Sequence, residues 1–318
     1  DSPLGLPPLA QAVVPGDRVA IAVESDVPQL PSLLTAVIEV LDSAGVAAED
    51  VEILYCDPAG AATGEQHEHD FAAWLRAELP SPYGEQVSIV AHRPADKESL
   101  SYLAATDDAR PIYLNRCLTD ADVVIPISCS RDEHAAGYHG SATGLHPTFS
   151  DAETVARFRA AASLAGAPAV ADPSVAATAA AAATRHRREV EQVAWLLGVQ
   201  FAVQVIPGAG DALLEVLVGD FATVADQARE RFDAAWHVDL PRPAELVVVA
   251  IAGGSQQQTW ENLGRALATA SRVVTAGGAI VVCCELADLP GPAVELLARF
   301  PEREIAEREI RRAGHPDT

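Results

Sequence analysis

Short runs of β-branched residues alternate with helical patterns along the chain, and this alternation limits the folds that the chain can adopt. It is typical of parallel sheets whose strands are connected by helices. Aromatic residues make up only 5% of the sequence although 49% is hydrophobic, so the core must be built from Ala, Val, Leu and Ile. That composition suits helices packed on parallel strands. We therefore predict an α/β fold.

The first 200 residues contain most of the expected elements. Candidate strands lie at residues 18–24, 51–56, 86–92, 111–114 and 122–128. Candidate helices lie at residues 31–44, 64–79, 97–105, 151–164 and 176–197. Ser150 is the expected N-cap of the fourth of these helices, because Glu153 three residues later completes a capping box.

A Leu-Pro-Arg-Pro segment at residues 240–243 is the best linker in the chain. Before it, two apolar runs flank a Pro/Gly turn and predict a hairpin-type pair or an added sheet edge, followed by a helix. After it, a new strand–helix–strand pattern begins. These elements lie at residues 201–206, 213–218, 221–236, 245–251, 256–271 and 278–285. We predict domains at 1–239 and 240–318, as two Rossmann-like open sheets with an interdomain cleft that binds the ligand.

The charge balance narrows the range of partners. Lys and Arg total 22 against 45 Asp and Glu, a net charge of −23. Such a surface repels nucleic acid and anionic lipid, so we expect neither as a partner, and a small anionic substrate would need a local cation. No apolar run reaches the roughly 18 residues of a spanning helix. The five cysteines show no CxxC spacing and are expected to be buried thiols of a reducing compartment, so we expect a cytoplasmic location.

The most promising loop follows the strand at 122–128. It contains imidazoles, acids and glycines, at Glu133, His134, Gly137, His139, Gly140 and His146. Glu133, His134 and His139 are candidate proton-transfer residues, and the glycines permit close backbone approach. His134 and His146 are weaker candidates for metal ligands, because the histidine spacing matches no standard zinc pattern. The alternative is a polar, glycine-rich connection with solvated histidines.

A second candidate site lies at the start of the helix predicted at 256–271. Ser255 and Gln258 form a capping box, and a helix N-terminus attracts anions such as a carboxylate. Asn262 and Arg265 are three residues apart and share one helix face, where they could bind a carboxylate. The alternative is an ordinary capped helix with a solvated arginine. GxGxxG and GxxxxGK[ST] nucleotide motifs are absent.

Asp26 ends the first predicted strand and is a candidate substrate-binding residue, because the carboxyl ends of parallel strands line one crevice. A turn-forming aspartate before Val-Pro explains the same residue equally well.

Several longer motifs resemble the lactate racemase (LarA-like) family. They are Arg-Pro-Ile-Tyr-Leu-Asn-Arg at 110–116, Asp-Ala-Asp-Val-Val-Ile-Pro-Ile at 120–127, Ala-Gly-Tyr-His-Gly at 136–140, Leu-His-Pro at 145–147, Gln-Thr-Trp-Glu-Asn at 258–262 and Gly-Gly-Ala-Ile-Val at 277–281. They follow one another in the family's order through nearly the whole chain. The family usually continues further, so we expect a C-terminal segment beyond residue 318.

The resemblance implies a cofactor, but several residues of this chain differ from those that hold it in the family. In the family, a nickel pincer nucleotide is tethered to a lysine in the glycine-rich loop and takes a hydride from a 2-hydroxy acid. That lysine falls at Thr143, and Lys97 is the only lysine in the chain. The family's catalytic histidine falls at Glu133 or His134, and no histidine stands near residues 157–159 for its downstream nickel ligand. Gly137, Gly140 and Thr143 would line the cofactor loop, but we expect no tethered cofactor.

Two functions follow from these observations. The first is an isomerase of the racemase or epimerase type that acts on a small 2-hydroxy acid or sugar acid with a divergent active site. His134 and His139 would transfer protons, and Asn262 with Arg265 would bind the carboxylate. The second is a non-catalytic protein that binds a small acid or a nucleotide. The oligomeric state has no signature in the sequence.

Overall fold

The computed structural model describes residues 2–24, 27–56, 65–106, 109–131, 143–165, 173–253, 257–287 and parts of 289–309. The chain forms two compact units. The first comprises residues 1–131, 138–155 and 185–237, and the second comprises residues 132–137, 156–184 and 238–318.

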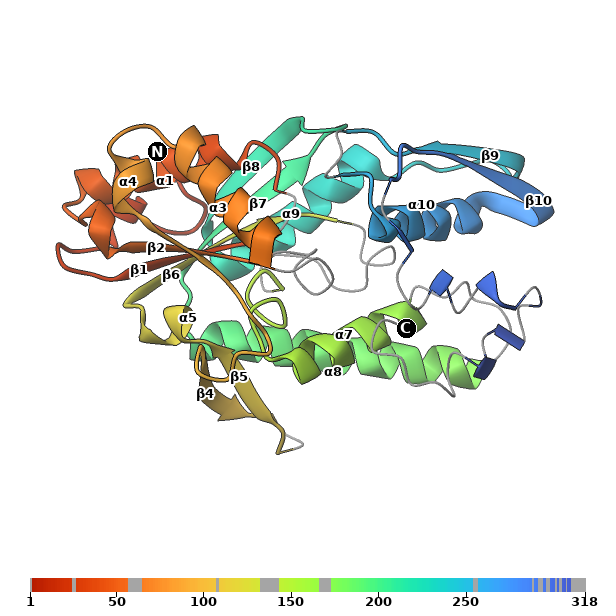
Figure 1. Cartoon of the computed structure of the whole chain (residues 1–318), viewed down its shortest axis with the longest axis horizontal. Helices are drawn as coiled ribbons and strands as arrows, with labels where there is room; N and C mark the ends of the chain where they lie inside the picture. The colour runs from red at the N-terminus through yellow and green to blue at the C-terminus, as the bar shows by residue number, and fades with distance from the viewer. Residues whose placement is uncertain are drawn as a thin grey trace. The chain divides into compact units, whose positions relative to one another are not determined.

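A six-stranded sheet forms the centre of the first unit (Figure 1). Its strands are β1 (Val19–Val23), β2 (Val51–Tyr55), β3 (Ser88–Ala91), β6 (Val123–Cys129), β7 (Phe201–Pro207) and β8 (Leu213–Asp220). They are ordered β3-β2-β1-β6-β7-β8, and all neighbours are parallel except β7 and β8. The strand order reverses between β1 and β6, the kind of position at which open α/β sheets bind ligands. The predicted α/β class is confirmed.

The two faces of β1 carry side chains of different size. Its valines and isoleucine pack with α1 (Leu30–Ser43) and α3 (Glu65–Glu78) in the largest core cluster. Ala20 and Ala22 point to the other face, where they pack with Leu145 and Phe149. Because alanine is small, residues 143–150 can lie close to this second face of the sheet.

The pair β7 and β8 extends the sheet as the predicted antiparallel addition, so that prediction is confirmed. Beyond β8, the amide of Leu4 donates to the carbonyl of Val218 (2.8 Å), and the amide of Asp220 donates to the carbonyl of Leu4 (2.7 Å). Gly219 has a φ of 148°, and a Cβ at this position would overlap the backbone of Leu4. The N-terminal segment therefore lies against the outer strand.

The prediction of a helix at 97–105 is wrong. Residues Leu100–Ala105 form β4, which pairs antiparallel with β5 (Pro111–Asn115). Leu100 and Leu103 have helical spacing, but the turn that follows them is closed by a hydrogen bond from the amide of Thr106 to the carbonyl of Arg110 (2.8 Å). Cross-strand pairing, which local periodicity does not report, therefore decides the structure of this segment.

Helix α9 (Phe221–Trp236) packs on β7 and β8 through Val224 and Ala228. Asp220 caps it, since its carboxylate accepts a hydrogen bond from the amide of Thr223 (2.9 Å). The remaining elements are η1 (Leu9–Gln11), η2 (Ala48–Asp50), α4 (Tyr83–Gln86), α5 (Arg116–Asp120), α7 (Ala152–Ala165) and α8 (Pro173–Leu196).

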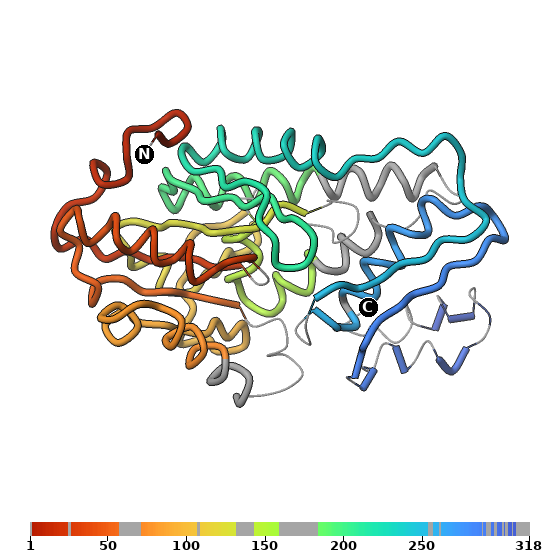
Figure 2. The backbone as a smooth tube through the Cα atoms, turned by 90° about the horizontal axis from the view of Figure 1, so that it is seen from above, coloured from red at the N-terminus to blue at the C-terminus, as the bar shows by residue number. Residues whose placement is uncertain are grey.

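The second unit contains the strand–helix–strand unit predicted after the linker. It consists of β9 (Ala244–Ala250), α10 (Trp260–Val273) and β10 (Val274–Cys283), with the two strands parallel. The three elements follow one another near the blue end of the tube in Figure 2. Helix α10 begins four residues later than predicted.

All five cysteines are free thiols, but they are not all buried as expected. Cys129 is buried, whereas Cys283 and Cys284 are exposed. Burial raises the pKa of the Cys117 thiol well above its usual range, so this side chain stays protonated. Among the described residues, no helix combines the length and the apolar character needed to cross a membrane.

Candidate functional site

The carboxyl end of β1 carries a buried acid that the sequence analysis did not select. Glu24 is only 4% exposed, and one of its carboxylate oxygens accepts a hydrogen bond from the amide of Cys129 (3.0 Å). The amide of Glu24 donates to the carbonyl of Ile127 (3.0 Å). Glu24 therefore bridges β1 and β6 at the point where the strand order reverses.

Three more buried polar side chains continue this site across β6 and β7. Ser128 donates to Oε1 of Gln204 (2.7 Å), and Nε2 of Gln204 donates to Oγ of Ser130 (3.0 Å). The amide of Ser130 donates to the carbonyl of Val205 (2.8 Å), which fixes the end of the strand. The three side chains are 0% to 6% exposed, and the rest of β6 and β7 is mostly apolar. Buried polar groups of this kind are stable only when they are hydrogen-bonded.

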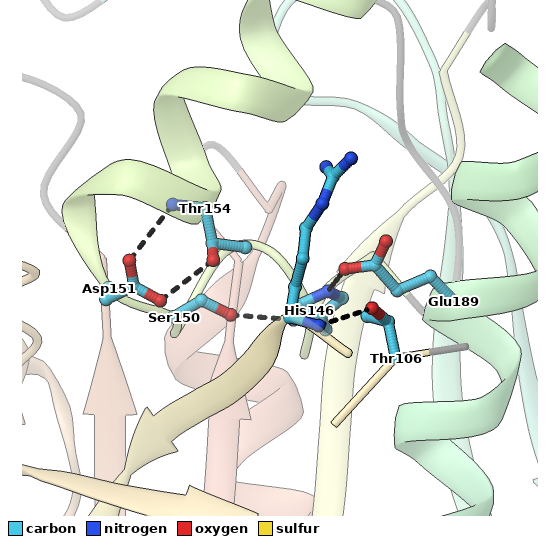
Figure 3. Close-up of polar contacts among 7 residues, drawn as sticks. Thr106, His146, Ser150, Asp151, Thr154 and Glu189 are labelled. Carbon is cyan, nitrogen blue, oxygen red and sulfur yellow. Dashed lines mark hydrogen bonds and ion pairs between the residues drawn. The ribbon is translucent and has the colours of Figure 1, made fainter. Parts of the chain in front are cut away.

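The loop that follows contains the fully buried His146. Its Nδ1 lies 2.7 Å from Oγ of Ser150, and its Nε2 lies 3.1 Å from a carboxylate oxygen of Glu189 on α8 (Figure 3). Ser150 is therefore not the helix cap that the sequence predicted. Asp151 caps α7 instead, since its carboxylate accepts hydrogen bonds from the amide and the hydroxyl of Thr154.

A second buried histidine lies behind this loop. Oδ1 of Asn115 accepts from the amide of Cys117 (3.0 Å), so its Nδ2 faces Nδ1 of His92 (3.2 Å). Nδ1 of His92 must then be an acceptor, and its Nε2 donates to the carbonyl of Ser150 (2.8 Å). This arrangement fits only the neutral imidazole. Burial lowers the pKa of His92 to about 4, which agrees with the hydrogen-bond pattern.

The start of α10 differs from the prediction. The N-cap is Thr259, whose hydroxyl accepts from the amide of Asn262 (3.1 Å). Gln258 does not complete a capping box, because its side chain donates to the carbonyl of Ile251 (3.0 Å) and accepts from the amide of Glu285 (2.8 Å). It thereby joins the carboxyl ends of β9 and β10.

Asn262 and Arg265 lie on one face of α10. Nη1 of Arg265 donates to Oδ1 of Asn262 (2.9 Å), and Nδ2 of Asn262 donates to the carbonyl of Gln257 (2.9 Å). The asparagine therefore orients the guanidinium. Both side chains are partly buried in the first two turns of the helix.

Several of the predicted site residues lie outside the described residues. They are Asp26, Glu133, His134, Gly137, His139, Gly140 and Ser255. Of the predicted residues that are described, Thr143 is half-buried, and its carbonyl accepts a hydrogen bond from the hydroxyl of Thr148 (2.6 Å). His146 already uses both ring nitrogens, so metal binding would require it to give up one of these contacts. In the described part of the chain, no group of three or more His, Cys, Asp or Glu side chains could hold a metal ion.

Glu24, Gln204 and Glu189 were not among the residues predicted from the sequence. Glu24 directly follows the run Val-Ala-Ile-Ala-Val, and an acid at the end of a buried strand is a signal that could have identified it. Gln204 interrupts an apolar strand, and a lone polar residue in such a strand indicates a buried hydrogen bond. Glu189 carries no local signal, because it resembles any charged residue of an exposed helix.

Comparison with known proteins identifies the relatives of this chain. A family model described as the lactate racemase N-terminal domain matches residues 1–167. The chain is similar to the structure of the lactate racemase apoprotein from Thermoanaerobacterium thermosaccharolyticum, with a TM-score of 0.73, 15% identity, and coverage of 97% of this chain and 71% of that one. It also resembles a protein from Thermotoga maritima, with a TM-score of 0.53, 18% identity, and coverage of 76% and 60%. No curated protein matches the chain.

Proposed function

The chain belongs to the lactate racemase family, and we propose that it is an isomerase of the racemase or epimerase type that acts on a small 2-hydroxy acid or sugar acid through a divergent site. The observation that carries this proposal is buried Glu24 next to the polar end of β6, at the reversal of strand order. The loop that contains His134 and His139 starts from that same strand end. Family membership supports the type of reaction. The position of Glu24 supports an active site at the carboxyl ends of β1 and β6.

The proposed reaction is a proton transfer at C2 of the acid. One base removes the C2 proton, and a second, protonated group on the opposite side delivers a proton to the other face; proton exchange of both groups with solvent then restores their starting protonation states. We propose His134 and His139 as this pair, with Glu133 as a further acid–base group. Asn262 and Arg265 are the proposed carboxylate-binding residues, because a guanidinium binds a carboxylate through two parallel hydrogen bonds.

The residues of this chain do not fit the tethered nickel cofactor of the family. The tether requires a lysine amine, but Thr143 stands at that position, and a threonine hydroxyl cannot form the same linkage. Lys97 is exposed in the segment before β4. We therefore propose that the chain carries no tethered pincer nucleotide, and no step above depends on one. Gly137 and Gly140 would then contact the substrate instead of the cofactor.

The second candidate function is a non-catalytic protein that binds a small acid or a nucleotide. Thr143 and His146 favour it, because their hydrogen bonds hold the loop together and join it to Glu189 of α8. For either function we expect a small anionic ligand, no nucleic acid partner given the net charge of −23, and a cytoplasmic location.

Hydrogen exchange distinguishes the two functions. The protein is incubated with one enantiomer of lactate, or with gluconate, in D₂O, and loss of the C2 proton is followed by NMR. An isomerase should exchange this proton, and His134→Ala or His139→Ala should slow the exchange by roughly 10² to 10⁴. Thermal stabilisation by these acids without exchange supports the binding protein, and the absence of both contradicts both functions.

A further inference from the structure

We propose that the turn between β7 and β8 (residues 207–212) couples the end of α9 to the start of α1. A displacement of α9 would then change the backbone at the carboxyl edge of the sheet. The turn and both helices belong to the first unit. The inference concerns a conformational coupling within that unit and does not depend on the proposed function.

The first anchor of the turn lies at the start of α1. Nε2 of Gln29 donates to Oδ2 of Asp211 (2.7 Å) and to its carbonyl (3.3 Å), and the amide of Gln29 donates to Oδ1 of Asp211 (3.4 Å). Gln29 is the N-cap of α1, and its φ of 54° lies in the left-handed region. A residue other than glycine keeps this strained conformation only when its contacts hold it there. Asp211 makes three of these contacts.

The second anchor lies at the end of α9. Nε1 of Trp236 donates to the carbonyl of Pro207 (2.8 Å). Trp236 is the last residue of α9, and its ring stacks on that of Phe232 at a centroid distance of 6.5 Å. The chain passes into the second unit after His237. This anchor therefore holds the turn to the place where the chain leaves the first unit.

The turn between the two anchors is tightly closed. The amide of Gly208 donates to the carbonyl of Ala212 (2.7 Å), and the amide of Ala212 donates to the carbonyl of Ala209 (3.2 Å). A Cβ on Gly208 would lie 2.8 Å from the Cβ of Ala212, and Gly210 has a φ of 63°. A turn closed in this way transmits a displacement of one anchor to the other.

The position of the first anchor gives the coupling its consequence. Gln29 follows β1 and Asp211 follows β7, and these two strands are separated by β6. Adjacent strands lie about 4.8 Å apart, so the contact spans two strand spacings. It lies at the edge where the strand order reverses, and both of its side chains are exposed. Because water can replace exposed hydrogen bonds, this contact can open while the core stays closed.

The test breaks one anchor and measures amide hydrogen exchange at the other by NMR. Asp211→Ala removes the carboxylate of the first anchor. The reporter at the other anchor is the amide of His237, which donates to the carbonyl of Asp233 (2.8 Å). We expect this amide to exchange about fivefold faster, as for the loss of one net hydrogen bond.

Trp236→Phe tests the coupling in the opposite direction, because phenylalanine keeps the ring stack but lacks the Nε1 donor. The reporter is the amide of Leu33, which donates to the carbonyl of Gln29 (3.2 Å) in the first turn of α1. It should also exchange about fivefold faster. Trp195→Phe is the matched control, because Trp195 is an exposed tryptophan of α8, and it should change neither reporter.

Gln29→Gly separates the coupling from the strain. Glycine adopts the left-handed backbone without strain, so α1 keeps its start while the side-chain bonds to Asp211 are lost. This variant should raise exchange at His237 about as much as Asp211→Ala does. The amide of Ile53, which is buried in β2, should exchange at the wild-type rate in every variant.

Effects confined to the altered anchor would overturn the proposal, because the two anchors would then be independent. Faster exchange at Ile53 would also overturn it, since the whole fold would then be loosened. In the double variant Asp211→Ala/Trp236→Phe, exchange at each reporter should match the larger of the two single effects. Single effects that multiply in the double variant would again show independent anchors.

Discussion

The neutral state of His92 makes a quantitative prediction about stability in acid. An unfolded histidine titrates near 6.5, whereas burial lowers the pKa of His92 to about 4 in the folded protein. Between these values the unfolded chain binds more protons, so the free energy of unfolding must fall as the pH falls from about 6.5 to about 4. A difference of this size corresponds to at most about 3.4 kcal/mol, of which about 2.5 kcal/mol is lost by about pH 4.5.

Urea unfolding of the wild type and of His92→Gln, at about pH 7.5 and pH 4.5, measures this contribution. Glutamine does not titrate, so the variant should lose about 2.5 kcal/mol less than the wild type between the two pH values. His237→Gln serves as the matched control, because His237 is exposed, and it should behave like the wild type. Carboxylates titrate in all three proteins, so their contribution to the change in the free energy of unfolding cancels in the comparison.

Equal acid sensitivity of the wild type and His92→Gln would refute this reasoning. A direct check needs no variant, because NMR of the imidazole reports its protonation. A His92 that titrates near 6.5 in the folded protein would mean that Asn115 does not hold its Nδ1 as an acceptor.

Three further predictions concern the other parts of the site. Protein produced together with the cofactor-synthesis enzymes should show its unmodified intact mass, since Thr143 replaces the tether lysine, and a covalent nucleotide adduct would contradict this. Arg265→Lys should weaken the calorimetric affinity for the acid that binds, because an ammonium lacks the planar fork, and unchanged affinity would remove Arg265 from the site. Glu189→Gln should lower the free energy of unfolding by about 1–3 kcal/mol, since it weakens the hydrogen bond to buried His146, and an unchanged urea midpoint would show that the pair contributes nothing.

The sequence predicted the parallel core well because strand and helix periodicities are local. The strands at 18–24, 51–56 and 122–128 correspond to β1, β2 and β6 within one residue at each end. The segment 97–105 failed because its helical spacing and its strand pairing use the same apolar residues, and only the partner strand decides between them. Local pattern therefore specifies a strand in the core better than a hairpin at the surface.

The helix caps show a similar limit. Ser150 and Gln258 both satisfy the capping-box pattern, yet in the fold Ser150 bonds His146 and Gln258 joins two strand ends. A side chain that can cap a helix can also serve a distant partner, and the sequence does not say which partner comes within reach. The same limit applies to the candidate site, because the ends of strands follow from local pattern whereas the residues that meet there do not.

The contact between Leu4 and Gly219 has a consequence for handling the protein. The outer strand of an open sheet can recruit a strand from another molecule, which is a common route to aggregation. Leu4 occupies part of that strand by donating one backbone hydrogen bond and accepting another, and Gly219 opposite allows this close approach. Deleting the first few residues, or replacing Gly219 with a larger residue, would leave β8 available to other chains, so an affinity tag is better separated from Leu4 by a spacer.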